Sequence, residues 1–130
     1  MNYKDYEYPG KKFRTCHRDD MYHVIRENDP TDLFSSVNDM FQMAFAIGFH
    51  LGKREPIGSG AINHTNISSM EVSHQDLIII LMLDRHPDIP DAQTLWGMVE
   101  EYAEYGIVIL YESLRRSDWV LDVDDVFADG

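Results

Sequence analysis

The chain has one cysteine, Cys16, and its longest apolar run is the seven residues 77–83. A single cysteine excludes a disulfide within the chain, which fits the reducing conditions of a cytoplasm. The run is much shorter than the roughly 20 apolar residues that a helix needs to span a bilayer. The first ten residues are polar and rich in tyrosine, unlike a secretory signal. We therefore expect a cytoplasmic protein without a membrane segment.

Basic side chains are scarce in the second part of the chain. Residues 55–130 hold 3 Lys and Arg against 15 Asp and Glu, whereas residues 1–54 hold 8 of each kind. The net charge of −12 therefore belongs to the second part. Such a surface favours solubility, attracts basic partner proteins and repels the phosphates of a nucleic acid. Broad contact with DNA is accordingly disfavoured, although the first part of the chain could still touch phosphates.

Recognisable catalytic and metal-binding motifs are also missing. The stretch 58–60, Gly-Ser-Gly, lacks the lysine and the spacing of a phosphate-binding loop. No two histidines are four residues apart, and no cysteine pair accompanies them. Cys16 stands beside His17, but adjacent residues seldom face each other as a nucleophile and its base. We therefore predict no catalytic residue, no metal and no cofactor, and we expect a protein that is not an enzyme.

What the chain does have is a strongly apolar helix at residues 36–51. Its apolar residues recur every three or four positions and also fill much of the remaining surface, as in a helix buried at the centre of a domain. Ser36 and Asp39 form a start signal, because a serine oxygen can accept from a free backbone N–H. Gly52 marks the end of the helix. We predict a mainly α, compact, single-domain fold arranged around this central helix.

Two more helices are predicted before the last third of the chain. The first spans residues 19–27, where apolar residues share one face. The second covers the apolar run 77–83 and is expected to start at Ser73, with Asp76 completing the capping pattern. Three consecutive isoleucines in this run favour a strand instead, so the alternative of a buried strand stays open.

The last long helix is expected to begin at Pro90 and to keep its apolar spacing as far as Leu114. Gly106 is a predicted break, since glycine weakens a helix interior. Three acidic residues are predicted to form the solvent-exposed face of this helix: Glu100, Glu101 and Glu104.

The two ends of the chain differ from the middle. Residues 1–10 are predicted to be an N-terminal arm, which could form a short N-terminal strand or dock on the domain or on a neighbour. Residues 11–116 form the helical domain, and residues 117–130 form a tail in which acidic residues alternate with apolar and aromatic ones. This tail is too apolar to be a purely solvated segment. We expect it to dock on its own domain or on a partner.

Two groups of residues are candidate contacts. The predicted partner-binding residues are Lys53 and Arg54, which follow the central helix, and Trp119 and Phe127 of the tail. The candidate nucleic-acid contacts are the basic residues near the N-terminus, Lys11, Lys12, Arg14 and Arg18.

Residues 34–114 also resemble a known family in two places. The first pattern consists of Phe34, Asp39, Ala44, Gly48, Phe49, Gly52, Arg54 and Pro56. The second is Glu101-Tyr102-Ala103, then Gly106, then Ile109-Leu110. Both are similar to the small accessory proteins encoded beside DNA phosphorothioation (Dnd) modification and restriction systems. The resemblance implies an accessory component of a prokaryotic defence system that marks or cuts DNA.

These observations lead to one main functional expectation and several alternatives. We expect a non-enzymatic accessory protein that binds a protein partner in a DNA-modification or restriction complex. One alternative is a small DNA-binding regulator with a ribbon-helix-helix or related helical fold, and another is an acidic protein that mimics nucleic acid and inhibits a DNA-binding protein. An enzyme whose site is assembled from distant residues is a further alternative. The apolar and aromatic content also allows a homodimer.

Overall fold

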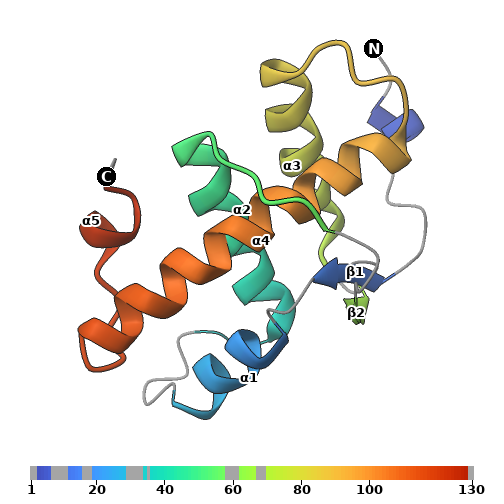
Figure 1. Cartoon of the computed structure of the whole chain (residues 1–130). Coiled ribbons are helices and arrows are strands. Elements are labelled where there is room, and N and C mark those ends of the chain that lie inside the picture. Colours follow the sequence, from blue (N-terminus) through green and yellow to red (C-terminus); the bar gives the residue numbers. More distant parts are fainter. Residues whose placement is uncertain are drawn as a thin grey trace.

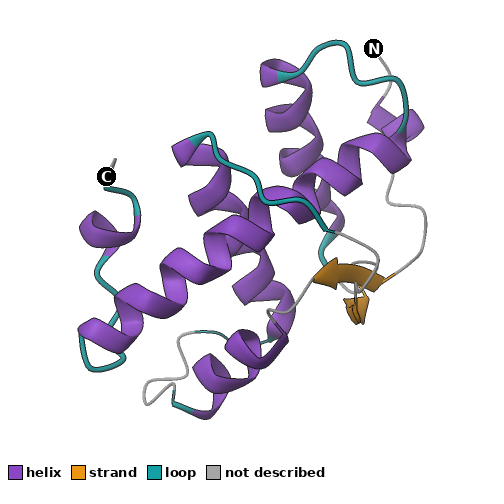
Figure 2. Cartoon of the chain, in the orientation of Figure 1, coloured by secondary structure: helices purple, strands orange, loops and turns teal. Residues whose placement is uncertain are grey.

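The computed structural model describes residues 3–6, 12–15, 19–28, 34, 36–57, 62–66 and 70–128. The described part is mainly α, as predicted, with five α-helices, one short 3₁₀ helix and two short strands (Figures 1 and 2). In chain order these are η1 (Tyr3–Tyr6), β1 (Lys12–Thr15), α1 (Asp19–Glu27), α2 (Val37–Leu51), β2 (Ile62–Asn66), α3 (Val72–Arg85), α4 (Ala92–Arg116) and α5 (Val123–Val126).

The longest helix, α4, lies at the centre and packs across α2 (Figure 1). Helix α2 is buried over most of its length, as predicted. However, η1, β1, α1, α3 and α5 contact α4, so the fold is organised around the α2–α4 pair rather than around α2 alone. A 25-residue helix offers enough length and enough separate faces for several short elements to pack on it.

Helices α2 and α4 cross at very short range. A Cβ atom at Gly48 would lie 2.7 Å from the backbone carbonyl carbon of Tyr102, and closer still to its oxygen. A Cβ atom at Gly106 would meet the carbonyl group of Ala44 in the same way. The predicted break at Gly106 is therefore wrong. Helix α4 runs on through this position, and the glycine is needed for close approach of two backbones.

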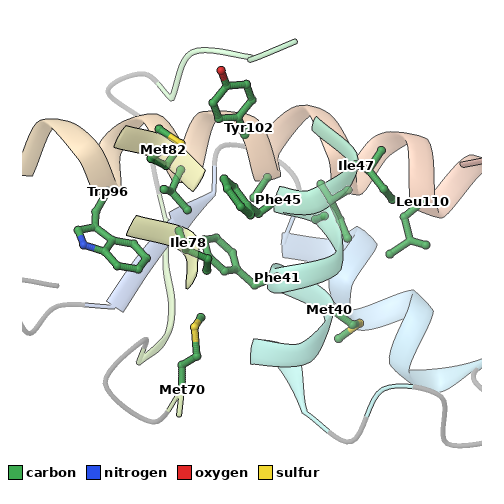
Figure 3. Close-up of a cluster of buried hydrophobic side chains, with 14 of the residues drawn as sticks. Met40, Phe41, Phe45, Ile47, Met70, Ile78, Met82, Trp96, Tyr102 and Leu110 are labelled. Atoms are coloured by element: carbon green, nitrogen blue, oxygen red, sulfur yellow. The ribbon is translucent and has the colours of Figure 1, made fainter. Parts of the chain in front are cut away.

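The core fills the space on both sides of this crossing (Figure 3). Its largest fully buried side chains come from four helices, since α1, α2, α3 and α4 each contribute. They include Trp96, Tyr22, Phe41, Ile25, Met40, Ile47, Ile79, Met82, Leu95 and Ile107.

The acidic face predicted for α4 is not exposed. Glu100 and Glu104 are buried, and Glu101 is half-buried. The prediction failed because it assumed one buried face, whereas α2 covers one side of α4 and α1 and β1 contact it as well. The Tyr22 side chain of α1 is fully buried, and its pKa is raised by burial and further by the negative charge of Glu104. The Tyr22 phenol is therefore held in its neutral form.

The predicted ends of α2 are confirmed. The Ser36 hydroxyl oxygen accepts a hydrogen bond from the Asp39 backbone N–H at 3.2 Å. Gly52 ends the helix in the left-handed conformation, with φ at 70°, and its N–H donates to the carbonyl groups of the last turn. This ending turns the chain back along α4, where the Glu55 N–H donates to the Glu101 carbonyl oxygen at 3.1 Å.

The run 77–83 is helical, so the strand alternative is excluded and the predicted helix is confirmed. Its predicted start is wrong, because α3 begins at Val72 and its N-cap, Glu71, forms no side-chain capping bond. In the connection between α2 and α3, residues 62–66 form a strand, β2, that the sequence analysis missed. β1 and β2 pair antiparallel, with Arg14 opposite Asn63 and Thr15 opposite Ile62.

Part of the N-terminal arm docks on the domain. Tyr3–Tyr6 form a 3₁₀ helix rather than a strand. The Tyr6 hydroxyl donates to the Ile89 carbonyl oxygen at 3.0 Å, and the Trp96 indole N–H donates to the Tyr6 carbonyl oxygen at 2.8 Å. These bonds attach η1 to the start of α4 and to the turn that precedes it.

Candidate functional site

The predicted partner-binding cations, Lys53 and Arg54, lie directly after the left-handed turn at Gly52 and are exposed. Arg54 Nη1 is 3.4 Å from the Glu101 carboxylate oxygen Oε1 on α4, and the guanidinium lies 5.6 Å from the centre of the Tyr102 ring. The Lys53 ammonium lies 5.8 Å from the centre of the Tyr105 ring. Both cations thus contact side chains of α4 and are themselves exposed.

A cluster that the sequence analysis missed adjoins these cations. The Arg85 guanidinium stacks 3.6 Å from the centre of the Phe49 ring and donates to the Phe49 backbone carbonyl. His86 Nε2 is 2.7 Å from the Tyr102 hydroxyl oxygen. The end of α3 is therefore attached both to the last turn of α2 and to the middle of α4. These residues are far apart in the sequence, and no local pattern connects them.

The surroundings of His86 in this cluster favour its neutral form. Its pKa is lowered first by burial and then by the positive charges of Arg54 and Arg85. A neutral imidazole suits the hydrogen bond to the Tyr102 hydroxyl, because one ring nitrogen can then donate or accept. The cluster joins three helices, and the Arg54 charge is offset by Glu101. We assign it a structural role.

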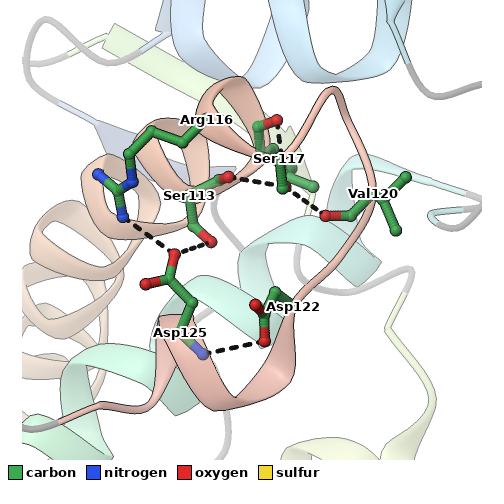
Figure 4. A network of polar contacts seen from close by, with 7 residues as sticks. Ser113, Arg116, Ser117, Val120, Asp122 and Asp125 are labelled. Carbon is green, nitrogen blue, oxygen red and sulfur yellow. Dashed lines mark hydrogen bonds and ion pairs between the residues drawn. The ribbon is translucent and has the colours of Figure 1, made fainter.

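The C-terminal segment, residues 117–128, folds back onto α4 through polar contacts (Figure 4). Asp122 starts α5, since its carboxylate accepts from the Asp125 N–H at 3.2 Å. Asp125 Oδ2 accepts from the Ser113 hydroxyl at 2.5 Å and lies 2.9 Å from Arg116 Nη2. The Ser113 hydrogen bond, followed by the Arg116 bond and charge, lowers the pKa of Asp125.

The predicted aromatic contacts of this segment pack on their own chain. Trp119 and Phe127 are both half-buried. The Trp119 ring lies edge-on to Tyr111 with centroids 6.3 Å apart, and the Phe127 ring lies edge-on to His50 at 5.3 Å. Val126 between them is fully buried. Docking of the segment on its own domain, one of the two alternatives, therefore occurs, and the half-exposed rings stay candidates for a partner.

Several exposed large apolar side chains lie on the outer side of α3. Leu77, Ile80 and Leu81 are 55%, 42% and 37% exposed, and together we call them the α3 face. Their spacing of three and four places them on one stripe of the helix. The opposite stripe, with Ile78, Ile79, Met82 and Leu83, is buried in the core.

This face results from the composition of the run and the position of the helix. Seven consecutive apolar residues cover a helix on all sides, but α3 lies at one side of the molecule, where it contacts chiefly α4 and η1 (Figure 1). Only the inner stripe can then be buried. The sequence shows the apolar run, but the peripheral position of the helix, which exposes some of its apolar side chains, comes only from the structure.

Only two of the four candidate nucleic-acid contacts belong to the described residues. Lys11 and Arg18 lie outside the described residues. Lys12 and Arg14 belong to β1, whose backbone pairs with β2 of the same chain. In the ribbon-helix-helix alternative, the basic segment 11–18 would be the strand that pairs with a second chain. Strand β1 lies in this segment and pairs with β2 of the same chain, so it differs from that arrangement.

Two classes of site are not found in the described part of the chain. No group of three or more His, Cys, Asp or Glu there could hold a metal ion. Among the same residues, no helix combines the length and the apolar character needed to cross a bilayer.

Comparison with protein-family models, with curated proteins and with solved structures finds no match for this chain.

Proposed function

We propose that this protein is a non-enzymatic interaction protein that binds a partner protein through the α3 face. The observation that supports the proposal is the exposure of Leu77, Ile80 and Leu81 as one stripe. Removing the apolar surface of leucine and isoleucine from water is favourable, by about 25 cal/mol per Å² buried. A contiguous exposed apolar patch is typical of an interaction site.

The setting of this interaction is proposed from the sequence resemblance. Residues 34–114 resemble the accessory proteins of DNA phosphorothioation systems, so we place the protein in the cytoplasm and expect the partner among the modification or restriction subunits of such a system. The residues of that resemblance include Gly48, Gly106 and Arg54. Gly48 and Gly106 allow the close approach of α2 and α4, and Arg54 pairs with Glu101 of α4. These residues therefore support a shared fold more than a shared binding site.

Two further surfaces are candidate contacts for the same partner. Lys53 and Arg54 are exposed beside α4, and Trp119 and Phe127 are half-exposed on the C-terminal segment. The rings of Trp119 and Phe127 already pack on the domain of their own chain. The α3 face, in contrast, has no covering element in the described part of the chain. For this reason we assign the main contact to the α3 face.

Affinity capture from a lysate of the native host tests the proposal. The intact wild-type chain is compared with a Leu77→Ser/Ile80→Ser variant and with Val123→Ser as the matched control. Val123 is 52% exposed but lies on α5, away from α3. We expect wild type and Val123→Ser to recover the same modification or restriction subunits. The double variant should recover them at least about tenfold less, because each lost apolar contact weakens binding by about 1–2 kcal/mol.

Circular dichroism melting of each variant keeps the result interpretable, since both substituted residues are largely exposed and the domain should stay folded. The proposal is wrong if the double variant recovers the same proteins in the same amounts. A loss with Trp119→Ala or Phe127→Ala, without unfolding and without a loss in the double variant, would move the contact to the C-terminal segment.

A further inference from the structure

The α3 face is bracketed by carboxylates. Asp76 and Asp84 lie on α3 at either end of the face, and Glu71 and Asp88 flank the helix. The stripe Leu77, Ile80, Leu81 continues directly to Asp84, at a spacing of seven residues from Leu77. Asp76 and Asp84 are eight residues apart, which corresponds to about 12 Å along the helix axis.

Apart from Glu71, whose carboxylate lies 3.9 Å from His74 Nε2, these carboxylates are not neutralised from within the described part of the chain. Asp76, Asp84 and Asp88 form no salt bridge with a described residue. Residues 55–130 contain only three basic side chains. Arg85 is held against Phe49, Arg116 is paired with Asp125, and Arg115 lies over the Tyr111 ring at 5.7 Å. Within the described residues, the apolar stripe is therefore bordered by carboxylates and has no lysine or arginine paired with them.

A second copy of the chain is disfavoured as the occupant of this surface. Each chain carries a net charge of −12, and two such chains repel each other. A partner with cations beside an apolar stripe would bind through two favourable contributions. It would bury the leucine and isoleucine side chains, and it would place positive charge near Asp76 and Asp84.

We propose that the α3 face binds an amphipathic helix of a partner protein whose apolar stripe is flanked by Lys or Arg about two helical turns apart. The inference rests on the proposed function, which makes this face the site of protein binding, and it adds the chemistry of the partner. Helix-on-helix docking of this kind uses apolar residues three and four positions apart, as α3 presents them from Leu77 to Ile80 and Leu81. Cations at the edges of the stripe set the register and steer the encounter.

Two synthetic helical peptides test the inference directly with the intact protein. Both are roughly 18 residues, or about five turns, with the same leucine stripe, and they carry either Lys or Glu at the same flanking positions. Binding is measured by fluorescence anisotropy at about 50 mM and about 500 mM salt. We expect the lysine peptide to bind, its affinity to fall at the higher salt concentration, and the glutamate peptide not to bind.

Variants of the protein show where the lysine peptide binds. Leu77→Ser/Ile80→Ser should weaken binding at least about tenfold, and Asp76→Asn/Asp84→Asn about three- to tenfold, as expected for two exposed ion pairs. Glu112→Gln, an exposed acidic residue on α4, is the matched control and should bind as wild type does. Equal weakening by Glu112→Gln, or none by the Leu77→Ser/Ile80→Ser pair, would show general attraction to an acidic protein and would overturn the inference.

The remaining outcomes separate this inference from the proposed function. Host proteins could require the α3 face in the capture experiment and yet bind the Asp76→Asn/Asp84→Asn variant as well as wild type. In that case the proposed function stands, and the inference that the partner contributes a basic helix is wrong. If neither peptide binds and sedimentation shows a dimer that Ile80→Ser dissociates, the occupant is a second copy, which also overturns the inference.

Discussion

Gly48 and Gly106 decide how closely α2 and α4 approach. At each position an added Cβ would overlap a backbone carbonyl of the other helix, and a backbone atom cannot move aside as a flexible side chain can. Gly97 on the same helix, α4, has open space where a Cβ would lie. The same residue type therefore has opposite consequences for stability at different positions on one helix.

We predict that Gly106→Ala and Gly48→Ala each lower the free energy of unfolding by about 2 kcal/mol or more, since overpacking outweighs the better helix propensity of alanine. Gly97→Ala should instead raise it by about 0.5–1 kcal/mol, because only the propensity changes. Urea unfolding followed by circular dichroism measures all three. Stabilisation by Gly106→Ala would mean that the helices do not cross at this short range.

At the scale of elements, α5 stays in place through one carboxylate and one buried side chain. Asp125 accepts from Ser113 and pairs with Arg116 on α4, and Val126 inserts into the core. The α3 helix is also attached by few residues, mainly Arg85 and His86 at its end and the inner apolar stripe. Short elements at the periphery therefore depend on individual contacts to α4 and α2.

The lowered pKa of Asp125 predicts a pH dependence of stability. The folded state favours the ionised carboxylate, so this contribution is present above the ordinary aspartate pKa and is lost as the pH falls through the lower pKa of the folded state. Asp125→Asn should thus be less stable than wild type near pH 7, and the difference should shrink as the pH falls below about 4.

Urea unfolding of both proteins over this pH range checks the prediction. Asp124→Asn, on the same short helix but outside the contacts with Ser113 and Arg116, is the matched control and should follow the wild-type curve more closely. A stability difference for Asp125→Asn that is independent of pH would rule out the ionised carboxylate as the group that holds α5.

At the scale of the whole molecule, charge is unevenly distributed along the chain. The carboxylates of residues 55–130 make this part strongly acidic, while the basic residues near the N-terminus balance their own part. An acidic molecule with a bare apolar stripe is suited to a basic protein partner, and it is poorly suited to a phosphate backbone.

We therefore predict that the intact protein does not shift a duplex DNA of roughly 30 base pairs at about 0.15 M salt, because phosphates are repelled by the acidic part. An electrophoretic shift assay at this and at a lower salt concentration measures it. A steeply salt-sensitive shift that Lys12→Ala/Arg14→Ala abolishes, and Glu112→Gln does not, would instead support the DNA-binding regulator.

The sequence by itself determined what depends on near neighbours. The helix at residues 37–51 is set by its apolar spacing, by the Ser36 cap and by Gly52, and all of these act within a few residues. The long helix after Pro90 follows from similar local rules, whereas for the run 77–83 these rules favoured a helix but left a buried strand open. The mainly α fold could therefore be predicted without knowledge of any tertiary contact.

Only the tertiary structure decided which side of each helix meets protein and which meets water. Burial of Glu100 and Glu104, exposure of Leu77 and Ile80, and the role of Gly106 depend on which elements contact α3 and α4, and residues far along the chain supply those elements. The α3 face was hidden in a run that looked fully buried. The physical reason is that periodicity shows how side chains are arranged around a helix, whereas burial depends on where that helix lies in the fold.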